Sequence, residues 1–254
     1  MVQASDEGRV EVINAEGVAT IRFFHPKGNS LPGTLLRSLA NEVTKIAGDA
    51  SAKVVVLASE GEAAFCGGAS FAELQSIKDK AQGKEFFSGF ARLILAMKNC
   101  PKFVIARVQS RAVGGGVGLA AAADYALATS VASAKLSELA LGIGPFVVGP
   151  AVERKVGTAA FTAMTIDYDW RDAAWCKQHG LYNEVYASIP ELDAAIAALT
   201  KKLAITSPEA MAKLKAIFWQ GTEHWPRLLE ERAEASGTLV LSDFSRNYIA
   251  SFSK

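Results

Sequence analysis

The sequence has few cysteines and no excess of charge of either sign. Its 254 residues include only three cysteines, Cys66, Cys100 and Cys176. Their odd number and wide spacing predict reduced thiols in an intracellular protein and no disulfide framework. With 27 Lys and Arg against 26 Asp and Glu, the chain lacks the bulk positive charge that attracts nucleic acid, which leaves only a local basic patch as a means of binding it. We therefore expect no nucleic-acid partner.

Long apolar runs and targeting segments are also missing. The longest uncharged candidate, Ala112–Ala123, is shorter than the roughly 18 residues that cross a bilayer and contains four glycines. The first residues, Met1–Gly8, are polar, which predicts no secretory signal. The last three, Phe252–Lys254, match no common sorting signal. We therefore expect a cytoplasmic protein with no membrane partner.

The chain does contain enough apolar sequence for a large core, because 50% of its residues are hydrophobic. Up to Gly157, apolar runs alternate with segments in which apolar residues recur at helical spacing. The runs predict strands at Val18–Phe24, Val54–Leu57, Lys102–Val108, Tyr125–Thr129 and Ala134–Leu136. The other segments predict helices at Gly33–Ala47, Ser76–Met97 and Leu119–Ala123. This order is typical of an α/β domain with largely buried parallel strands.

After Gly157 the strand signals stop, and five helices are predicted, with glycines or prolines near several of their ends. They span Thr158–Ile166, Asp172–His179, Pro190–Ile205, Pro208–Trp219 and Pro226–Leu241. Two arrangements are open for this helical tail, since it can pack on its own core or on a neighbouring subunit.

The first stretch that suggests chemistry is Phe65–Phe71, which follows the predicted strand Val54–Leu57 and a polar turn. Gly67 and Gly68 allow a tight turn and a close approach of a ligand to the backbone. Cys66 lies in this stretch, and we interpret it as a buried, unreactive thiol. Taken alone, the stretch favours an ordinary strand-to-helix connection over a ligand site.

The second stretch, Arg111–Leu119, follows a predicted strand and opens a predicted helix. The triplet Gly114-Gly115-Gly116 exposes backbone N–H groups, and the start of a helix adds partial positive charge. This predicts a site for a phosphate or for a developing oxyanion. The stretch matches neither a Walker loop nor a dinucleotide fingerprint. A glycine-rich contact between helix and sheet is the alternative.

The third stretch, Lys135–Pro145, carries Glu138 within a strongly apolar run. Burial without a cation raises the pKa of a carboxyl group, and a raised pKa suits a general acid/base near neutral pH. Taken alone, such a glutamate is more often a structural carboxylate paired with a cation.

In this order and spacing, the three stretches resemble the enoyl-CoA hydratase/isomerase (crotonase) superfamily. The resemblance begins at the turn Phe24–Leu31, continues through Val104–Asp124 and Glu138–Gly157, and extends into the helical tail. It implies a crotonase-like (ββα-superhelix) α/β core over residues 1–195 and a C-terminal helical trimerisation region over residues 196–254. It also implies a homotrimer, often paired into a hexamer, that binds an acyl-CoA thioester. We expect no metal and no cofactor apart from the CoA of the substrate.

The resemblance also implies roles for individual residues. The backbone N–H groups of Ala69 and Gly115 match the pair that holds the thioester oxygen, and Glu138 matches an acid/base. Two fixed donors aimed at that oxygen stabilise an enolate, and each is worth about 10²–10³ in rate. The positions that match the path of the substrate are Lys27, Ser70, Phe71, Ala72, Gly114 and Gly118. A solvated surface lysine explains Lys27 equally well.

Two positions depart from the family pattern. Hydratases of the family carry a second glutamate 20 residues before the first, and that position is Gly118 here. The lone Glu138 is enough to move a proton between carbons, as enoyl-CoA isomerases do. Gly118 also predicts extra room in the pocket for a branched or carboxylated acyl group. The second departure, Pro145–Pro150, resembles the methylglutaconyl-CoA hydratase branch of leucine breakdown.

Several other residues have two explanations. A set at helical spacing lies where relatives line the acyl pocket, although core packing explains it as well: Phe86, Phe87, Phe90 and Ile94. Asp124 is predicted to be structural. Arg107, inside an apolar strand, predicts a structural ion pair in preference to a contact with a substrate carboxylate.

Three functions remain open at this point. The Pro145–Pro150 resemblance favours hydration, and the lone Glu138 favours Δ3-Δ2-enoyl-CoA isomerisation. Loss of the carboxylate at Gly118 favours a non-catalytic acyl-CoA-binding protein, but retention of Ala69 and Gly115 argues against it.

The helical tail carries more apolar residues than a peripheral segment needs, which predicts a subunit interface. They are Met211, Leu214, Ile217, Phe218, Trp225, Leu228, Leu229, Leu239, Val240, Leu241 and Phe244. The alternative is a tail that covers its own core.

Overall fold

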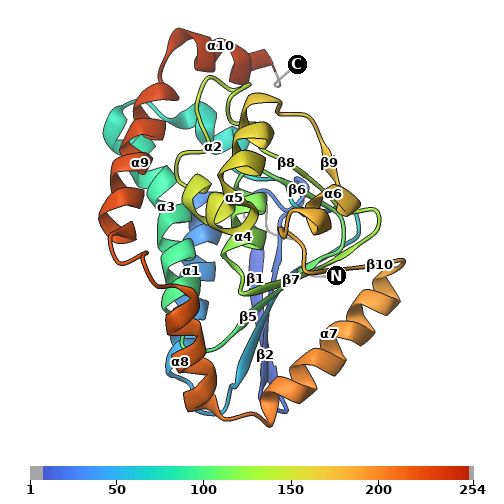
Figure 1. Cartoon of the computed structure of the whole chain (residues 1–254). Coiled ribbons are helices and arrows are strands. Elements are labelled where there is room, and N and C mark those ends of the chain that lie inside the picture. The colour runs from blue at the N-terminus through green and yellow to red at the C-terminus, as the bar shows by residue number, and fades with distance from the viewer. Residues whose placement is uncertain (1–7, 252–254) are drawn as a thin grey trace, which may run out of the picture.

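The computed structural model describes residues 8–251, so the expectations for the first seven and the last three residues lie outside it. Its larger sheet has the strand order β1-β2-β3-β5-β7-β10 (Figure 1). These strands are β1 (Arg9–Ala15), β2 (Val18–Phe24), β3 (Val54–Ser59), β5 (Val104–Val108), β7 (Tyr125–Thr129) and β10 (Glu184–Tyr186). β1 pairs antiparallel with β2, and all other neighbours pair in parallel. The predicted α/β class with parallel strands is confirmed.

A second, smaller sheet has the order β4-β6-β8-β9. It consists of β4 (Ala64–Cys66), β6 (Arg111–Val113), β8 (Ser133–Lys135) and β9 (Arg171–Asp172). Only β8 is predicted from sequence, because segments of two or three residues show no periodicity. The first three strands of this sheet are parallel, so β4 and β6 end side by side, directly before the two glycine stretches.

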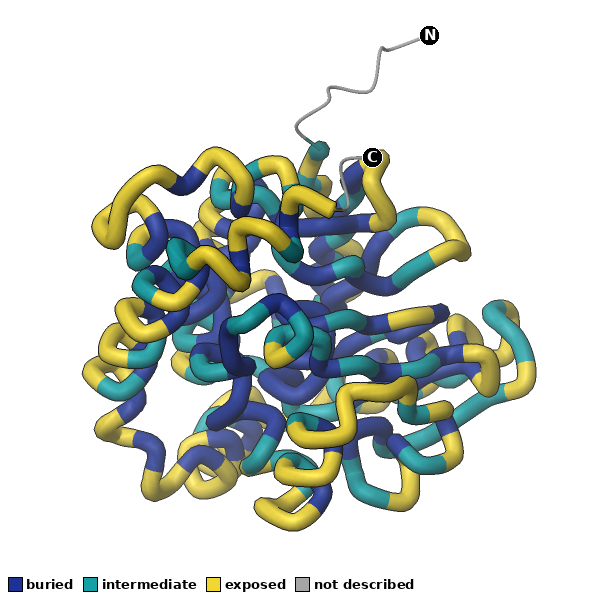
Figure 2. Tube along the Cα trace, turned by 90° about the horizontal axis from the view of Figure 1, so that it is seen from above, coloured by how far each residue is buried: buried dark blue, intermediate teal, exposed yellow. Residues whose placement is uncertain are grey.

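Helices cover both faces of the larger sheet. On one face, Ile21 and Leu57 belong to the main core together with α1 (Gly33–Gly48) and α3 (Lys80–Asn99). On the other face, Val56 packs with Leu192 of α7 (Ile189–Ala204). β3 is therefore buried along its whole length, as expected for a strand with helices on both sides. Figure 2 shows buried backbone in the interior and exposed backbone along the outer helices.

Three helices begin earlier or later than the sequence predicts. α3 begins at Lys80 because the side chain of Asp79 accepts a hydrogen bond from the Gln82 N–H and caps the helix; a separate α2 (Phe71–Ser76) precedes it. α4 (Gly115–Ala122) begins within the glycine triplet. α5 (Gly149–Ile166) begins well before the predicted Thr158 and is interrupted at Gly157, whose φ is 79°.

The helical tail folds back over its own core (Figure 1). Its last part consists of α8 (Pro208–Phe218), α9 (Trp225–Leu239) and the unpredicted α10 (Asp243–Ser251), and α6 (Ala173–Gln178) and α7 precede them. α9 packs on α3 with their backbones in contact, since a Cβ on Gly83 would lie 2.5 Å from the carbonyl oxygen of Gly237. The predicted division between residues 195 and 196 falls inside α7. No helix among residues 8–251 has the length and apolar character needed to cross a bilayer.

Some of the apolar tail residues are covered by the chain's own core. Met211, Trp225, Leu229 and Val240 are buried within the chain. For these four side chains the expected subunit interface is therefore wrong, because the chain's own core covers them. Other members of the set remain exposed: Leu214, Ile217, Phe218, Leu239 and Phe244.

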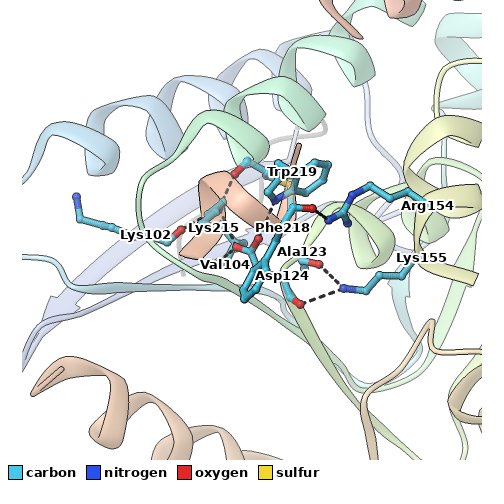
Figure 3. Close-up of polar contacts among 10 residues, drawn as sticks. Lys102, Val104, Ala123, Asp124, Arg154, Lys155, Lys215, Phe218 and Trp219 are labelled. Carbon is cyan, nitrogen blue, oxygen red and sulfur yellow. Dashed lines mark hydrogen bonds and ion pairs between the residues drawn. The ribbon is translucent and has the colours of Figure 1, made fainter. Parts of the chain in front are cut away.

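A buried ion pair joins the tail to the sheet (Figure 3). Lys215 of α8 lies with its Nζ 2.7 Å from Oδ2 of Asp124, and both side chains are almost fully buried. Asp124 also accepts hydrogen bonds from the Val104 backbone N–H and from Nε1 of Trp219. The predicted structural role of Asp124 is confirmed. Arg107 likewise forms the expected ion pair, with Asp193.

Candidate active site

The second glycine stretch forms a sharp turn between β6 and α4. Gly114 has a φ of 51° and a ψ of −112°, a backbone conformation that favours glycine. Its N–H donates to the carbonyl of Lys135 at 2.8 Å, which ties the turn to β8. A Cβ at position 114 would lie 3.0 Å from Oε1 of Glu138. The missing side chain therefore lets the carboxylate lie against the backbone of the turn.

The next two glycines are required by packing. A Cβ on Gly115 would overlap the ring of Phe90, and one on Gly116 would lie 2.7 Å from the Cβ of Cys66. Burial raises the pKa of the Cys66 thiol to about 12, which is consistent with the interpretation of Cys66 as unreactive. The triplet thus brings the start of α4 close to both α3 and β4.

The first glycine stretch lies against the second. Gly68 has a φ of 85°, and a Cβ there would be 2.8 Å from the carbonyl oxygen of Val113 and 3.7 Å from the amide nitrogen of Gly115. Among residues 8–251, neither the Ala69 nor the Gly115 amide donates a hydrogen bond to a protein acceptor. Two free backbone donors therefore line the same small space.

That space is a cavity of about 60 Å³ between the two glycine stretches, α3, α9 and the segment after Glu138. Its walls are mainly apolar side chains and glycine backbone. Polar side chains enter it at only three of the described lining positions, Ser137, Glu138 and Ser236. The remaining lining residues are small or apolar: Gly67, Gly68, Ala69, Phe71, Leu74, Phe87, Phe90, Val113, Gly114, Gly115, Leu141, Ile143, Gly144, Pro145, Phe146, Val147 and Val148.

The surroundings of Glu138 raise the pKa of its carboxyl group. The residue as a whole is half-buried, but its Oε2 is enclosed and has no hydrogen-bond partner among the described residues. Burial raises the pKa of Glu138 to about 7, and hydrogen bonds from the N–H groups of Glu138 and Ser137 oppose that rise. Since no Lys, Arg or His lines the cavity, a cation partner for Glu138 is absent from the described lining.

The expectation that Gly118 leaves room in the pocket is wrong. A Cβ at this position would lie 2.5 Å from Cγ1 of Val148. The side chain of Val148 therefore fills the space that a larger residue at 118 would need, and Gly118 itself is not part of the cavity lining. Val148 belongs to the segment Pro145–Pro150, so this segment occupies the space that a carboxylate at position 118 would need.

A groove of about 340 Å³ adjoins the cavity and is lined by half of the six residues expected along the substrate path. It shares Gly67, Ala69 and Phe71 with the cavity and is also lined by Lys27 and Ala72. Ser70 lies apart from both, since its buried hydroxyl accepts a hydrogen bond from the Glu73 N–H and caps α2.

The aromatic set on α3 divides between two roles. Phe87 and Phe90 line the cavity, whereas Phe86 and Ile94 are buried in the main core outside the lining. Ser236, which comes from α9 about 100 residues after Glu138, also lines the cavity and is not predicted from the sequence. A run of small residues in α9, Ala235-Ser236-Gly237, is the signal that was available.

Comparisons with known proteins agree with this geometry. The enoyl-CoA hydratase/isomerase family model matches residues 14–246. The chain is 30% identical over 229 residues to the mitochondrial methylglutaconyl-CoA hydratase of Rattus norvegicus, covering 87% of this chain and 72% of that protein. It is 26% identical to a probable enoyl-CoA hydratase of Bacillus subtilis (strain 168), over 92% of each. The fold superposes on an enoyl-CoA hydratase from Mycobacterium avium with a TM-score of 0.84 and 27% identity, covering 96% and 95% of the two chains.

Proposed function

Because this chain belongs to the enoyl-CoA hydratase/isomerase family, we propose that it adds water across, or shifts, the double bond of a short enoyl-CoA thioester. One observation carries the proposal. The unpartnered Oε2 of Glu138 is buried in the lining of the same cavity as the free N–H groups of Ala69 and Gly115. An unsatisfied carboxylate oxygen beside two unsatisfied donors is the arrangement needed for proton transfer next to a carbonyl.

In this proposal, the amides of Ala69 and Gly115 bind the thioester oxygen. Charge develops on that oxygen when a proton leaves the neighbouring carbon or when water attacks the conjugated double bond. Donors fixed by Gly68 and Gly114, both at positive φ, do not have to reorganise as the charge appears. This kind of preorganised stabilisation is the largest single contribution in many acyl-transfer and enolate-forming enzymes.

Glu138 is proposed to accept and return the proton. A pKa of about 7 makes the carboxylate available near neutral pH while leaving the protonated form strong enough to donate. Its position against Gly114 holds the carboxyl group beside one of the two oxyanion donors.

The size and chemistry of the cavity support a short, uncharged acyl group. About 60 Å³ is small beside the 300 Å³ or more of sites for drug-sized ligands. The free carboxylate of a methylglutaconyl group would be buried here without a Lys, Arg or His partner in the lining, which is costly. The adjoining groove, with Lys27 at its edge, is the proposed path for CoA.

A second candidate reaction is Δ3-Δ2 isomerisation, favoured by one observation. Val148 fills the space beside Gly118, so α4 offers no second carboxylate. The test follows the absorbance of the conjugated thioester with crotonyl-CoA, 3-butenoyl-CoA and methylglutaconyl-CoA. We expect turnover of one or both C4 substrates and slower turnover of methylglutaconyl-CoA. Binding of these thioesters without any turnover would instead support the non-catalytic alternative.

We also propose that the protein assembles into a trimer or a pair of trimers. The support is the apolar surface that remains on α8, where Leu214, Ile217 and Phe218 are 46%, 55% and 49% exposed. Exposed patches of this kind usually mark interfaces, and cyclic symmetry would cover each copy. A monomer mass in light scattering at micromolar concentration, with activity intact, would contradict this proposal.

A further inference from the structure

The C-terminal helix α9 contributes a polar side chain to the cavity. Its backbone contacts that of α3 at Gly237, where a Cβ would lie 2.6 Å from the carbonyl carbon of Gly83. Because α9 lies this close, the preceding residue, Ser236, is buried and lines the cavity next to the α3 side chains Phe87 and Phe90.

The hydroxyl of Ser236 makes no hydrogen bond among residues 8–251. This is unusual, because serines in helices commonly bond to the carbonyl four residues earlier. The Oε2 of Glu138 in the same lining is also without a partner. The hydroxyl-bearing Ser236 and the enclosed Oε2 of Glu138, neither with a hydrogen bond to a described residue, therefore belong to the lining of one small cavity. Such groups call for a ligand or a bound water.

The cavity is large enough for a water molecule. A buried water needs about 10–15 Å³ of free volume and two or more polar partners, and the cavity offers about 60 Å³. α4 supplies no partner from position 118, since Val148 lies where a side chain on Gly118 would go. Of the lining side chains, those that remain are Glu138, Ser137 and Ser236.

We propose that Ser236 positions the water that adds to the enoyl double bond, so that α9 supplies the polar group that α4 lacks. This inference rests on the proposed function. The water donates one O–H to Oε2 of Glu138 and the other to Oγ of Ser236, with a lone pair directed at C3. The O–C3 bond forms as Glu138 takes the proton. The C2=C3 electron pair moves toward the thioester oxygen, and Glu138 then returns the proton to C2.

Isomerisation provides a built-in comparison, because it needs no water. Glu138 takes a proton from C2 of a 3-enoyl thioester, the double bond moves into conjugation, and the proton returns at C4. Both reactions use Glu138 and the thioester oxygen site, but only hydration uses the water. Loss of the Ser236 hydroxyl should therefore separate the two rates.

The experiment compares two C4 substrates. Crotonyl-CoA reports hydration as a loss of conjugated-thioester absorbance, and 3-butenoyl-CoA reports isomerisation as a gain. We expect Ser236→Ala to lower kcat for hydration about tenfold or more, which is the scale of one lost hydrogen bond to a reacting group, while isomerisation changes less than twofold. Ser236→Thr keeps the hydroxyl and should retain most of the hydration rate.

Ser245→Ala is the matched control, since Ser245 is a buried serine of the same tail whose hydroxyl already donates to the Leu239 carbonyl. It should leave the ratio of the two rates unchanged. Equal loss of both rates in Ser236→Ala, or no loss of hydration, would overturn the inference. So would a wild-type protein that isomerises without hydrating, although the role of Glu138 would then stand. A wild-type protein inactive on both substrates would reject the proposed function itself.

Discussion

Asp124 and Glu138 are both carboxylates enclosed by this chain, but they differ in what surrounds their oxygens. Asp124 has Lys215 as an ion-pair partner and receives further hydrogen bonds from Val104 and Trp219 (Figure 3). Glu138 has an apolar cavity, hydrogen bonds from its own turn, and one oxygen without any partner among the described residues.

The difference separates stability from chemistry. A buried carboxylate with every oxygen satisfied is fixed in place and joins α8 to the sheet. A buried carboxylate with a free oxygen costs stability, and such groups concentrate where a ligand or a proton is to be handled. Substitutions at the two positions should therefore have opposite consequences for stability and for activity.

The largest effect is expected from Glu138→Gln. Glutamine keeps the size of the side chain but cannot exchange a proton, so turnover should fall by about 10²–10⁴ while binding of the CoA thioester survives. Steady-state rates with C4 enoyl-CoA substrates and a binding titration measure the two properties. A variant that keeps more than a tenth of the wild-type rate would exclude Glu138 as the acid/base.

Lys215→Met should have the reverse profile. It leaves Asp124 buried without its cation, which typically costs about 3–5 kcal/mol in the free energy of unfolding. Activity per folded molecule should be unchanged, because Lys215 is not part of the cavity lining. Urea unfolding measures the loss, with Lys213→Met as the control, since Lys213 is exposed on the same helix. Equal stability of the two variants would contradict a structural role for the pair.

The sequence predicts the two carboxylates better than it predicts the cavity around Glu138. Asp124 and Glu138 are both recognised, as are the two glycine stretches, because their spacing resembles a known family and short-range patterns reveal strands and helices. The cavity's far wall is not predicted. Val148 and Ser236 enter it through packing between distant segments, and the contact of Gly83 with Gly237 has no local signature. The short strands β4 and β6 are missed for a related reason, since only pairing with neighbouring strands defines them.

The pH dependence of stability should differ between wild type and Glu138→Gln. The pKa of Glu138 is about 7 in the folded protein against an ordinary value of 4.5. The folded state therefore holds a proton that the unfolded state has lost between these pH values. Stability linked to this group is present below about pH 4.5 and is lost as the pH rises to about 7.

The glutamine variant lacks this loss, so it should gain stability relative to wild type between pH 4.5 and 8, by at most about 3 kcal/mol. Urea unfolding of both proteins across this range is the measurement. A constant difference between them would show that Glu138 ionises as easily in the folded protein as in the unfolded chain.

The smallest effect concerns the wall beside Glu138, where Gly118 and Val148 are packed together. Gly118→Ala places a Cβ 2.5 Å from Cγ1 of Val148, and overpacking of this kind typically costs about 1–3 kcal/mol. Val148→Ala alone removes two buried methyl groups and should also destabilise the protein.

In the double variant, the new methyl group occupies space that Val148 has vacated. The double variant should therefore lose less stability than the sum of the two single losses, with a coupling energy of about 0.5–3 kcal/mol. Additive losses, measured by urea unfolding, would show that Val148 does not occupy the space beside position 118. Coupling would mean that a glutamate at 118 requires a smaller residue at 148, so the missing second carboxylate and the apolar Pro145–Pro150 segment are maintained together.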